Sequence, residues 1–155
     1  MNIEEALKID ITDKNVLIVG YPATGKTHFS NLLNAENHNV LHSDNFKQFG
    51  FKESLYELMK SIESSTRKTI VEGIQGYRLL RKGVELNNYY PDIVFEMISK
   101  EETIIDRYNK ERDTAKIKYI QSTCKSLDTI KNDYRSVYQE KYPKWIIVEN
   151  DIISE

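Results

Sequence analysis

The sequence GYPATGKT occupies Gly20–Thr27. It fits the pattern G-x-x-x-x-G-K-[ST], in which a glycine-rich loop surrounds phosphate oxygens. A short apolar run rich in β-branched residues, Asn15–Val19, comes directly before it and predicts a buried strand. The residues after it place three apolar side chains on one face of a predicted helix: Phe29, Leu32 and Leu33. Strand, glycine loop and helix follow in the order that a phosphate site requires, so a chance match to an ordinary turn is the weaker interpretation.

Each residue type in Gly20–Thr27, called the phosphate loop below, has a physical task. Gly20 and Gly25 let backbone N–H groups turn inward around phosphate oxygens, and the start of the next helix adds partial positive charge. Lys26, expected in a solvated loop, is predicted to reach the outer phosphates, and Thr27 to offer its hydroxyl to Mg²⁺. The predicted nucleotide-binding residues are Gly20, Tyr21, Pro22, Ala23, Thr24, Gly25, Lys26, Thr27 and His28.

Composition sets limits on the class of protein. The 155 residues suit one domain, and 39% hydrophobic with 30% charged residues is ordinary for a globular chain. The net charge of −2 argues weakly against a tight nucleic-acid binder, because no strong basic field is present. The single cysteine, Cys124, has no partner for an internal disulfide. The start of the chain has no apolar leader and no apolar run reaches ~18 residues, so we expect a cytoplasmic protein without a membrane partner.

Two carboxylates stand at the ends of predicted strands. Asp44 follows a short strand at Val40–Ser43, and Glu72 lies at the end of a strand at Thr69–Gly73. Ligands of parallel sheets bind outside the carboxyl ends of the strands, which is where the phosphate loop must also lie. We therefore predict that Thr27, Asp44 and Glu72 hold Mg²⁺, directly or through water. An ordinary strand-end Glu72 and a turn or capping Asp44 are the alternatives.

Further side chains are candidates for binding a second substrate. Phe46 either lines an acceptor pocket or covers the core. Arg78 lies in a basic segment, residues 77–83, which is a helix or a loop; it either faces solvent or holds an anionic acceptor through paired hydrogen bonds. The predicted substrate-binding residues are Asp44, Phe46 and Arg78. The remaining elements expected are helices at Ser54–Ser64, 104–112 and 114–142, and strands at Pro91–Ile98 and Trp145–Val148.

Taken in order, these pieces resemble the small P-loop kinases, the group that includes nucleoside monophosphate, shikimate, gluconate and polynucleotide kinases. The resemblance covers Val16–Asn150 and rests on four segments: Gly20–Thr27, Ser43-Asp44, Val71-Glu72-Gly73 and Arg107–Arg112. It implies an α/β three-layer sandwich in a single domain, 1–155. The sheet would have five parallel strands in the order 2-3-1-4-5, with helices on both faces.

The resemblance also implies an activity. Members of the group use ATP and Mg²⁺ to phosphorylate a hydroxyl acceptor, here a nucleoside, nucleotide or nucleic-acid hydroxyl. Asp44 would take or orient the acceptor proton. A lid near residues 107–116 would bring Arg107 and Arg112 over the phosphates, so the predicted catalytic residues are Lys26, Asp44, Arg107 and Arg112.

Departures from the group leave the acceptor open. Tyr21-Pro22 stands where many members carry small residues, and no long insertion forms a separate acceptor domain. A kinase of a hydroxymethylated base in DNA is one alternative. Another is a P-loop NTPase or nucleotide switch that uses water: Gln75 follows the third strand as a water-orienting glutamine would, although no Asn-Lys-x-Asp motif is present.

Overall fold

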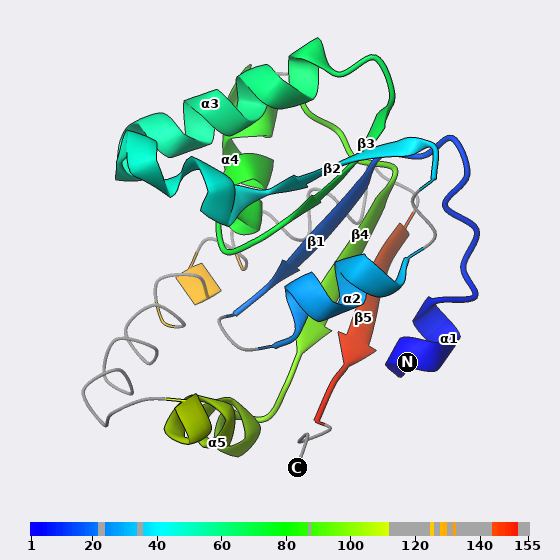
Figure 1. The fold of residues 1–155 in the computed structure, drawn as a ribbon, viewed down its shortest axis with the longest axis vertical. Helices are drawn as coiled ribbons and strands as arrows, with labels where there is room; N and C mark the ends of the chain where they lie inside the picture. Colours follow the sequence, from blue (N-terminus) through cyan, green and yellow to red (C-terminus); the bar gives the residue numbers. More distant parts are fainter. Residues whose placement is uncertain are drawn as a thin grey trace.

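Five parallel strands form one sheet at the centre of the molecule (Figure 1). The structure, a computed structural model, describes residues 1–21, 24–33, 36–86, 88–111, 125, 128–129, 132 and 144–151, with only the backbone of 51, 84 and 108–111. The strands are β1 (Val16–Gly20), β2 (His38–His42), β3 (Lys68–Glu72), β4 (Ile93–Ile98) and β5 (Lys144–Glu149). Their order is β2-β3-β1-β4-β5, which confirms the predicted topology.

The register aligns the carboxyl ends of the strands along one edge. Ile18 of β1 lies opposite Glu72 of β3, which in turn lies opposite His42 of β2. On the other side, Gly20 lies opposite Met97 of β4. The phosphate loop, which leaves β1 at Gly20, therefore starts near the carboxyl ends of β3 and β4, and β2 ends on the far side of β3.

Helices cover both faces of the sheet. α1 (Ile3–Ala6) and α2 (Lys26–Leu32) lie on one face, and α3 (Phe51–Ser64) and α4 (Gly76–Leu86) on the other (Figure 1). A 3₁₀ helix, η1 (Ser43–Phe49), joins β2 to the short turn before α3. α5 (Glu101–Glu111) follows β4 at the carboxyl end of the sheet (Figure 1).

Alternation along β1 divides the core between the two faces. Leu17 and Val19 pack with residues of α3 and α4, whereas Val16 and Ile18 pack with Phe29 of α2 and with α1. Every residue of β1 is buried, as expected for a central strand of a parallel sheet that is covered on both faces. This burial holds the start of the phosphate loop in a rigid frame.

Some local expectations were wrong. Leu32 is 47% exposed, because α2 ends there and only Leu33, in extended backbone, returns to the core. The second strand ends at His42, so Ser43 and Asp44 belong to η1 rather than to the strand end. The segment 77–83, left open between helix and loop, is part of α4.

Two of the expected helices lie wholly or partly outside the described residues. The helix expected over 114–142 falls in the region of which only residues 125, 128–129 and 132 are described. The expected helix ending at Arg112 is described as far as Glu111. In the part of the chain that the structure describes, no helix has the length and apolar character needed to cross a membrane.

Candidate phosphate-binding site

The phosphate loop leaves β1 through tightly packed backbone. A Cβ at Gly20 would lie 2.6 Å from Thr24 Oγ1 and 2.8 Å from the Met97 carbonyl oxygen, so the loop turns where only glycine fits. Gly25 has a φ of +88°, in the left-handed region that favours glycine, and it immediately precedes α2. Thr24 is fully buried and donates its hydroxyl to the Tyr21 carbonyl oxygen at 2.8 Å. These contacts hold both ends of the described loop.

Lys26 is folded back onto its own loop. Its ammonium group donates to the Tyr21 carbonyl oxygen at 2.8 Å, and the residue is only 9% exposed. The expectation of a solvated side chain was therefore wrong: the apolar stem of Lys26 is covered, and its charge is held by backbone. Lys26 and Thr24 both donate to the Tyr21 carbonyl oxygen, which keeps the ammonium group beside the start of the loop.

The structure brings together Thr27 and Glu72, two of the three predicted metal ligands. Thr27 Oγ1 donates to Glu72 Oε1 at 3.2 Å, although the two residues lie on α2 and at the end of β3. Glu72 is 4% exposed and also accepts a 2.6 Å hydrogen bond from His42 Nδ1. A hydroxyl and a carboxylate oxygen placed together are the hard donors that Mg²⁺ prefers, so this pair fits the expected metal.

Mg²⁺ normally takes one or two carboxylates and completes its shell with water and phosphate oxygens. Among the described residues, no group of three or more His, Cys, Asp or Glu side chains is placed to hold a metal. The Thr27–Glu72 pair is therefore suited to a metal that arrives with a nucleotide.

Asp44 lies in the first turn of η1 and is exposed to solvent. It is two residues beyond His42, whose ring reaches Glu72, so its backbone starts from the same edge of the sheet. Between them, buried Ser43 packs against Gly73, where φ is +137° and any Cβ would overlap the Ser43 hydroxyl. This contact brings the start of η1 against the turn after β3.

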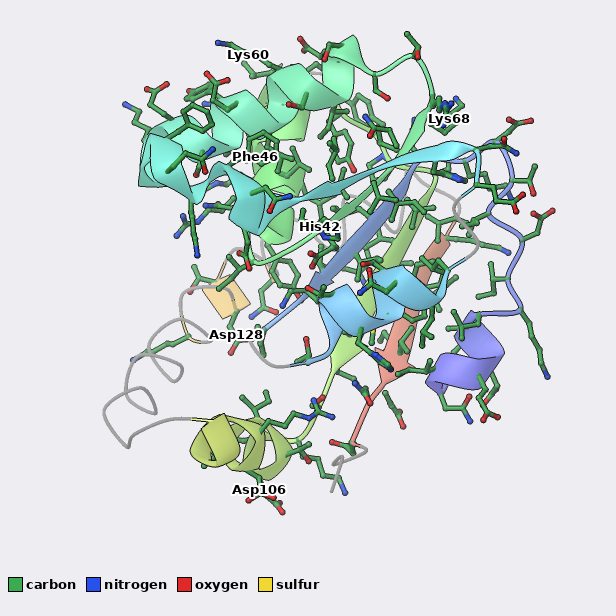
Figure 2. The ribbon with its side chains drawn as sticks, in the orientation of Figure 1. His42, Phe46, Lys60, Lys68, Asp106 and Asp128 are labelled. Carbon is green, nitrogen blue, oxygen red and sulfur yellow. The ribbon has the colours of Figure 1, made fainter. Side chains whose placement is uncertain are left out.

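Phe46 and Arg78 lie on the face that α3 and α4 cover. Phe46 is half-buried against the core cluster of that face (Figure 2), and its ring centroid is 6.5 Å from that of exposed Phe49. Arg78 is half-buried on α4. His28, predicted to touch nucleotide, is exposed on α2. Pro22, Ala23 and Arg112 lie outside the described residues.

Arg107 is held at the carboxyl ends of β4 and β5. Its guanidinium donates to Ser99 Oγ at 3.1 Å and to the Asn150 carbonyl oxygen at 2.8 Å. Burial lowers the pKa of Arg107 from its ordinary value. Asn150 in turn donates its side-chain amide to the Thr24 carbonyl oxygen at 3.0 Å. The predicted lid arginine is thus connected to the phosphate loop through one residue.

Sequence reasoning missed three polar residues near this edge. His42 and Asn150 stand at or just past strand ends, which is the only signal that the sequence offered for them. The third, Glu96, is fully buried in β4 and accepts hydrogen bonds from Tyr77 Oη at 2.9 Å and Trp145 Nε1 at 3.4 Å. A lone glutamate within the apolar strand Ile93–Ile98 was the signal for a buried, partnered carboxylate.

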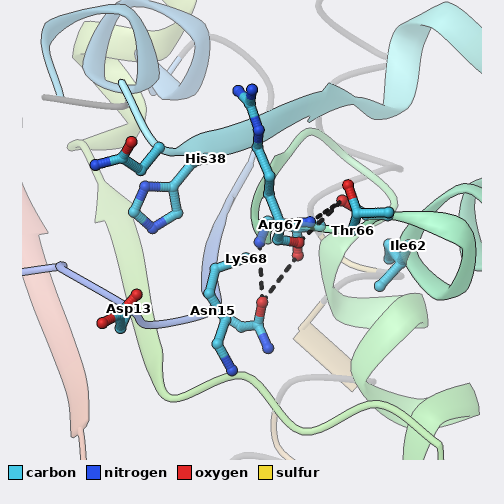
Figure 3. A pocket seen from close by; sticks show the side chains of 10 residues that line it. Asp13, Asn15, His38, Ile62, Thr66, Arg67 and Lys68 are labelled. Carbon is cyan, nitrogen blue, oxygen red and sulfur yellow. Dashed lines mark hydrogen bonds between the residues drawn. The ribbon is translucent and has the colours of Figure 1, made fainter.

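A cavity of about 610 Å³ lies at the opposite end of the sheet. Residues before β1 and at the starts of β2 and β3 line it, among them Asn15, His38, Arg67 and Lys68 (Figure 3). Because ligands of open α/β sheets bind at the carboxyl ends of the strands, this cavity is separate from the candidate site. Its size does not identify it as the nucleotide site.

Comparison with known proteins supports the same fold. No protein-family model and no curated protein sequence matches the chain. Among solved structures, shikimate kinase from Acinetobacter baumannii in complex with shikimate is similar, with a TM-score of 0.54 and 19% identity over 88% of this chain and 84% of that one. Deoxyadenosine kinase from M. mycoides with bound dATP is also similar, with a TM-score of 0.53 and 13% identity over 90% of this chain and 92% of that one. At these identities the likeness shows the fold alone: the chain has the fold of the small P-loop kinases.

Proposed function

We propose that this protein is an ATP-dependent phosphotransferase that moves the γ-phosphoryl group to a hydroxyl acceptor. The observation that carries the proposal is the Thr27–Glu72 contact of 3.2 Å beside the phosphate loop, at the carboxyl edge of the sheet. Hydroxyl and carboxylate groups placed there suit a metal–nucleotide complex. The fold shared with small kinases supports the same reaction class.

The proposed reaction needs positioning and charge more than covalent chemistry. Bound ATP with Mg²⁺ would supply the phosphoryl group. The bond from the γ-phosphorus to its bridging oxygen breaks, a bond to the acceptor oxygen forms, and ADP leaves. Lys26 would exchange the Tyr21 carbonyl for phosphate oxygens and stabilise the charge that develops there. Thr27 and Glu72 would hold the metal.

Asp44 is proposed as the residue that receives or orients the acceptor proton. Its exposure at the start of η1 leaves the carboxylate accessible to a second substrate. An exposed carboxylate is a weak base, so orientation of the hydroxyl would be the larger part of its work. Phe46 and Arg78, on the neighbouring α3–α4 side, are proposed to contact the acceptor.

The lid arginines complete the proposed machinery. Arg112 is proposed to approach the phosphates. Arg107 already lies at the carboxyl edge, with its guanidinium on Ser99 and Asn150. To touch a phosphate directly, Arg107 would have to exchange these partners.

Hydrolysis by water is less well supported as the main reaction. Gln75, the candidate for orienting water, donates its amide to Ser54 Oγ of α3 at 3.3 Å, and its amide oxygen is buried. A glutamine bound to a helix in this way does not present both polar atoms to a water beside a phosphate. We therefore assign Asp44 and the surface around it to an acceptor larger than water.

A ³¹P NMR screen tests the proposal. ATP and Mg²⁺ would be offered with nucleosides, nucleotides, sugars, shikimate-like alcohols, and DNA bearing 5′-hydroxyl or hydroxymethyl groups. We expect ADP together with a new phosphomonoester signal for one acceptor class, and neither product with Lys26→Ala. ADP with inorganic phosphate alone would indicate an NTPase, and nucleotide binding without turnover would indicate a switch. Phosphorylation of hydroxymethylated DNA alone would identify the acceptor as a modified base.

A further inference from the structure

Asn150 stands where β5, α5 and the phosphate loop meet. It directly follows β5, is 7% exposed, and donates its backbone N–H to the Ile98 carbonyl oxygen at 2.8 Å. Its polar side chain is therefore buried at the carboxyl edge of the sheet. A buried amide needs hydrogen-bond partners, and those partners indicate what the residue does.

The side chain of Asn150 binds the phosphate loop. Its Nδ2 donates to the Thr24 carbonyl oxygen at 3.0 Å, across 126 positions of sequence, and the bond is buried. The same amide lies against Gly25, where an added Cβ would collide with it. Asn150 therefore contacts the two residues that come immediately before Lys26.

This hydrogen bond fixes the direction of a backbone N–H. Thr24 C=O and Gly25 N–H belong to one planar peptide unit, and the described peptides include no cis bond. In a trans unit the C=O and N–H point in opposite directions. Because Asn150 holds the carbonyl oxygen, the Gly25 N–H is directed away from Asn150. A glycine-rich loop binds phosphate through N–H groups oriented in this way.

The backbone carbonyl of Asn150 is held as well. Arg107 Nη2 donates to it at 2.8 Å, and Ser99 Oγ donates to the same oxygen. Arg107 Nη1 also donates to Ser99 Oγ at 3.1 Å, so these three residues form a closed set of contacts. The next residue, Asp151, accepts from Lys100 N at 2.8 Å and joins β5 to the start of α5.

We propose that Asn150 is a positioning residue of the phosphate loop, and that Arg107 acts through it by fixing its backbone. The inference rests on the proposed function for the identity of the nucleotide. The ordering of the phosphate loop by Asn150 does not require a bound nucleotide. A substitution of Arg107 therefore alters the conformation of the loop through Asn150. The position of α5 and the conformation of the loop are thereby coupled.

Two variants of Asn150 test the first half of the proposal. Asn150→Leu keeps nearly the same volume and removes the donor, while Asn150→Asp replaces the donor by an acceptor facing the Thr24 carbonyl. Glu149→Gln is the matched control, because it changes the exposed residue on the other side of Asn150 and does not touch the loop. Amide hydrogen exchange over residues 20–28 is measured without nucleotide, followed by calorimetry with ATP and Mg²⁺.

Both Asn150 variants should exchange loop amides at least about tenfold faster than wild type and bind ATP with Mg²⁺ at least about tenfold more weakly, the loss expected for one buried hydrogen bond. Glu149→Gln should match wild type within about threefold in both measurements. Unchanged exchange in the Asn150 variants overturns the proposal. Unfolding of both variants would also overturn it, because that result would show that Asn150 stabilises the whole fold. If wild type itself binds no nucleotide, the proposed function fails, and the exchange result still decides the role of Asn150.

A double-mutant cycle tests the second half. Arg107→Gln should also raise exchange of the loop amides without nucleotide, where no phosphate is present for Arg107 to contact. Combined with Asn150→Leu, it should add little to the larger single effect, because both changes release the same link. Independent, additive increases in exchange would contradict the link through Asn150.

Discussion

Glu72 Oε1, at the end of β3, accepts a hydrogen bond from Thr27 Oγ1 of the phosphate loop at 3.2 Å. The same oxygen accepts from His42 Nδ1 at 2.6 Å. One carboxylate thus joins β2, β3 and the start of α2. Its burial at 4% exposure means that its partners, rather than water, determine where its oxygens point.

Glu72→Gln should weaken binding of ATP with Mg²⁺ by about tenfold, because the amide keeps the shape of the side chain and loses the charge that attracts the metal. Calorimetric titration of ATP with Mg²⁺, repeated with ATP in excess EDTA, separates the contribution of the metal to binding from that of the nucleotide. Binding without Mg²⁺ should change little. Glu53→Gln, at an exposed position of α3, is the control. Equal loss with and without Mg²⁺ would remove Glu72 from the metal site.

Asp44→Asn distinguishes an acceptor-orienting carboxylate from a turn residue. The change keeps size and capping ability and loses the proton acceptor, so phosphoryl transfer should fall by roughly 10²–10⁴-fold. Nucleotide binding should fall much less. Single-turnover rates with the acceptor found by the NMR screen provide the measurement. A rate within threefold of wild type would place Asp44 outside the mechanism, since Asn caps a turn nearly as well.

Gly73→Ala should destabilise the protein more than Gly50→Ala. Both glycines have positive φ, +137° and +84°, so each substitution costs about 1–2 kcal/mol of backbone strain. Only at Gly73 would the new Cβ overlap another side chain, the buried Ser43 hydroxyl; nothing lies within 4 Å at Gly50. Urea unfolding should show a Gly73→Ala loss that exceeds the Gly50→Ala loss by about 1–3 kcal/mol. Equal losses would mean that η1 does not pack against the turn after β3.

The folding stability should depend on pH in part through Asp151. The Lys100 N–H, followed by the Thr103 hydroxyl, lowers the pKa of Asp151 below its ordinary value of 3.8. A lowered folded pKa stabilises the protein above the unfolded pKa, and this contribution is lost as pH falls through the folded pKa. Asp151→Asn should therefore be less stable than wild type at neutral pH, and the two curves should converge below pH 3.8. A stability difference that does not change with pH would contradict this.

The sequence predicted the elements that depend on local pattern. Gly20–Thr27, the apolar strand before it and the strand-end Glu72 were all identified, because periodicity and strand ends are local signals. The strand order 2-3-1-4-5, which the resemblance to the small P-loop kinases implied, is also the observed order. The prediction that Thr27 and Glu72 lie at one edge followed from the rule that the carboxyl ends of parallel strands share an edge.

Other long-range contacts could not be predicted. Asn150 reaches Thr24 across 126 positions, and no spacing rule relates them. The hydrogen bond from Lys26 to Tyr21 depends on the direction of the Tyr21 carbonyl, which a loop pattern does not specify. Leu32 was predicted to share a helix face with Phe29 and Leu33, but α2 ends at Leu32, which is 47% exposed.

The nucleotide site is tested most directly by calorimetric titration of ATP with Mg²⁺ into the wild-type protein and into Lys26→Ala. Lys47→Ala, which changes an exposed lysine of η1, is the control. Unfolding curves establish that each variant is folded, which matters because Lys26 is 9% exposed. We expect saturable binding by wild type and by Lys47→Ala, and binding weaker by at least about tenfold in Lys26→Ala. Absence of binding by wild type, or equal binding by folded Lys26→Ala, would contradict the assignment of Gly20–Thr27 as a nucleotide site.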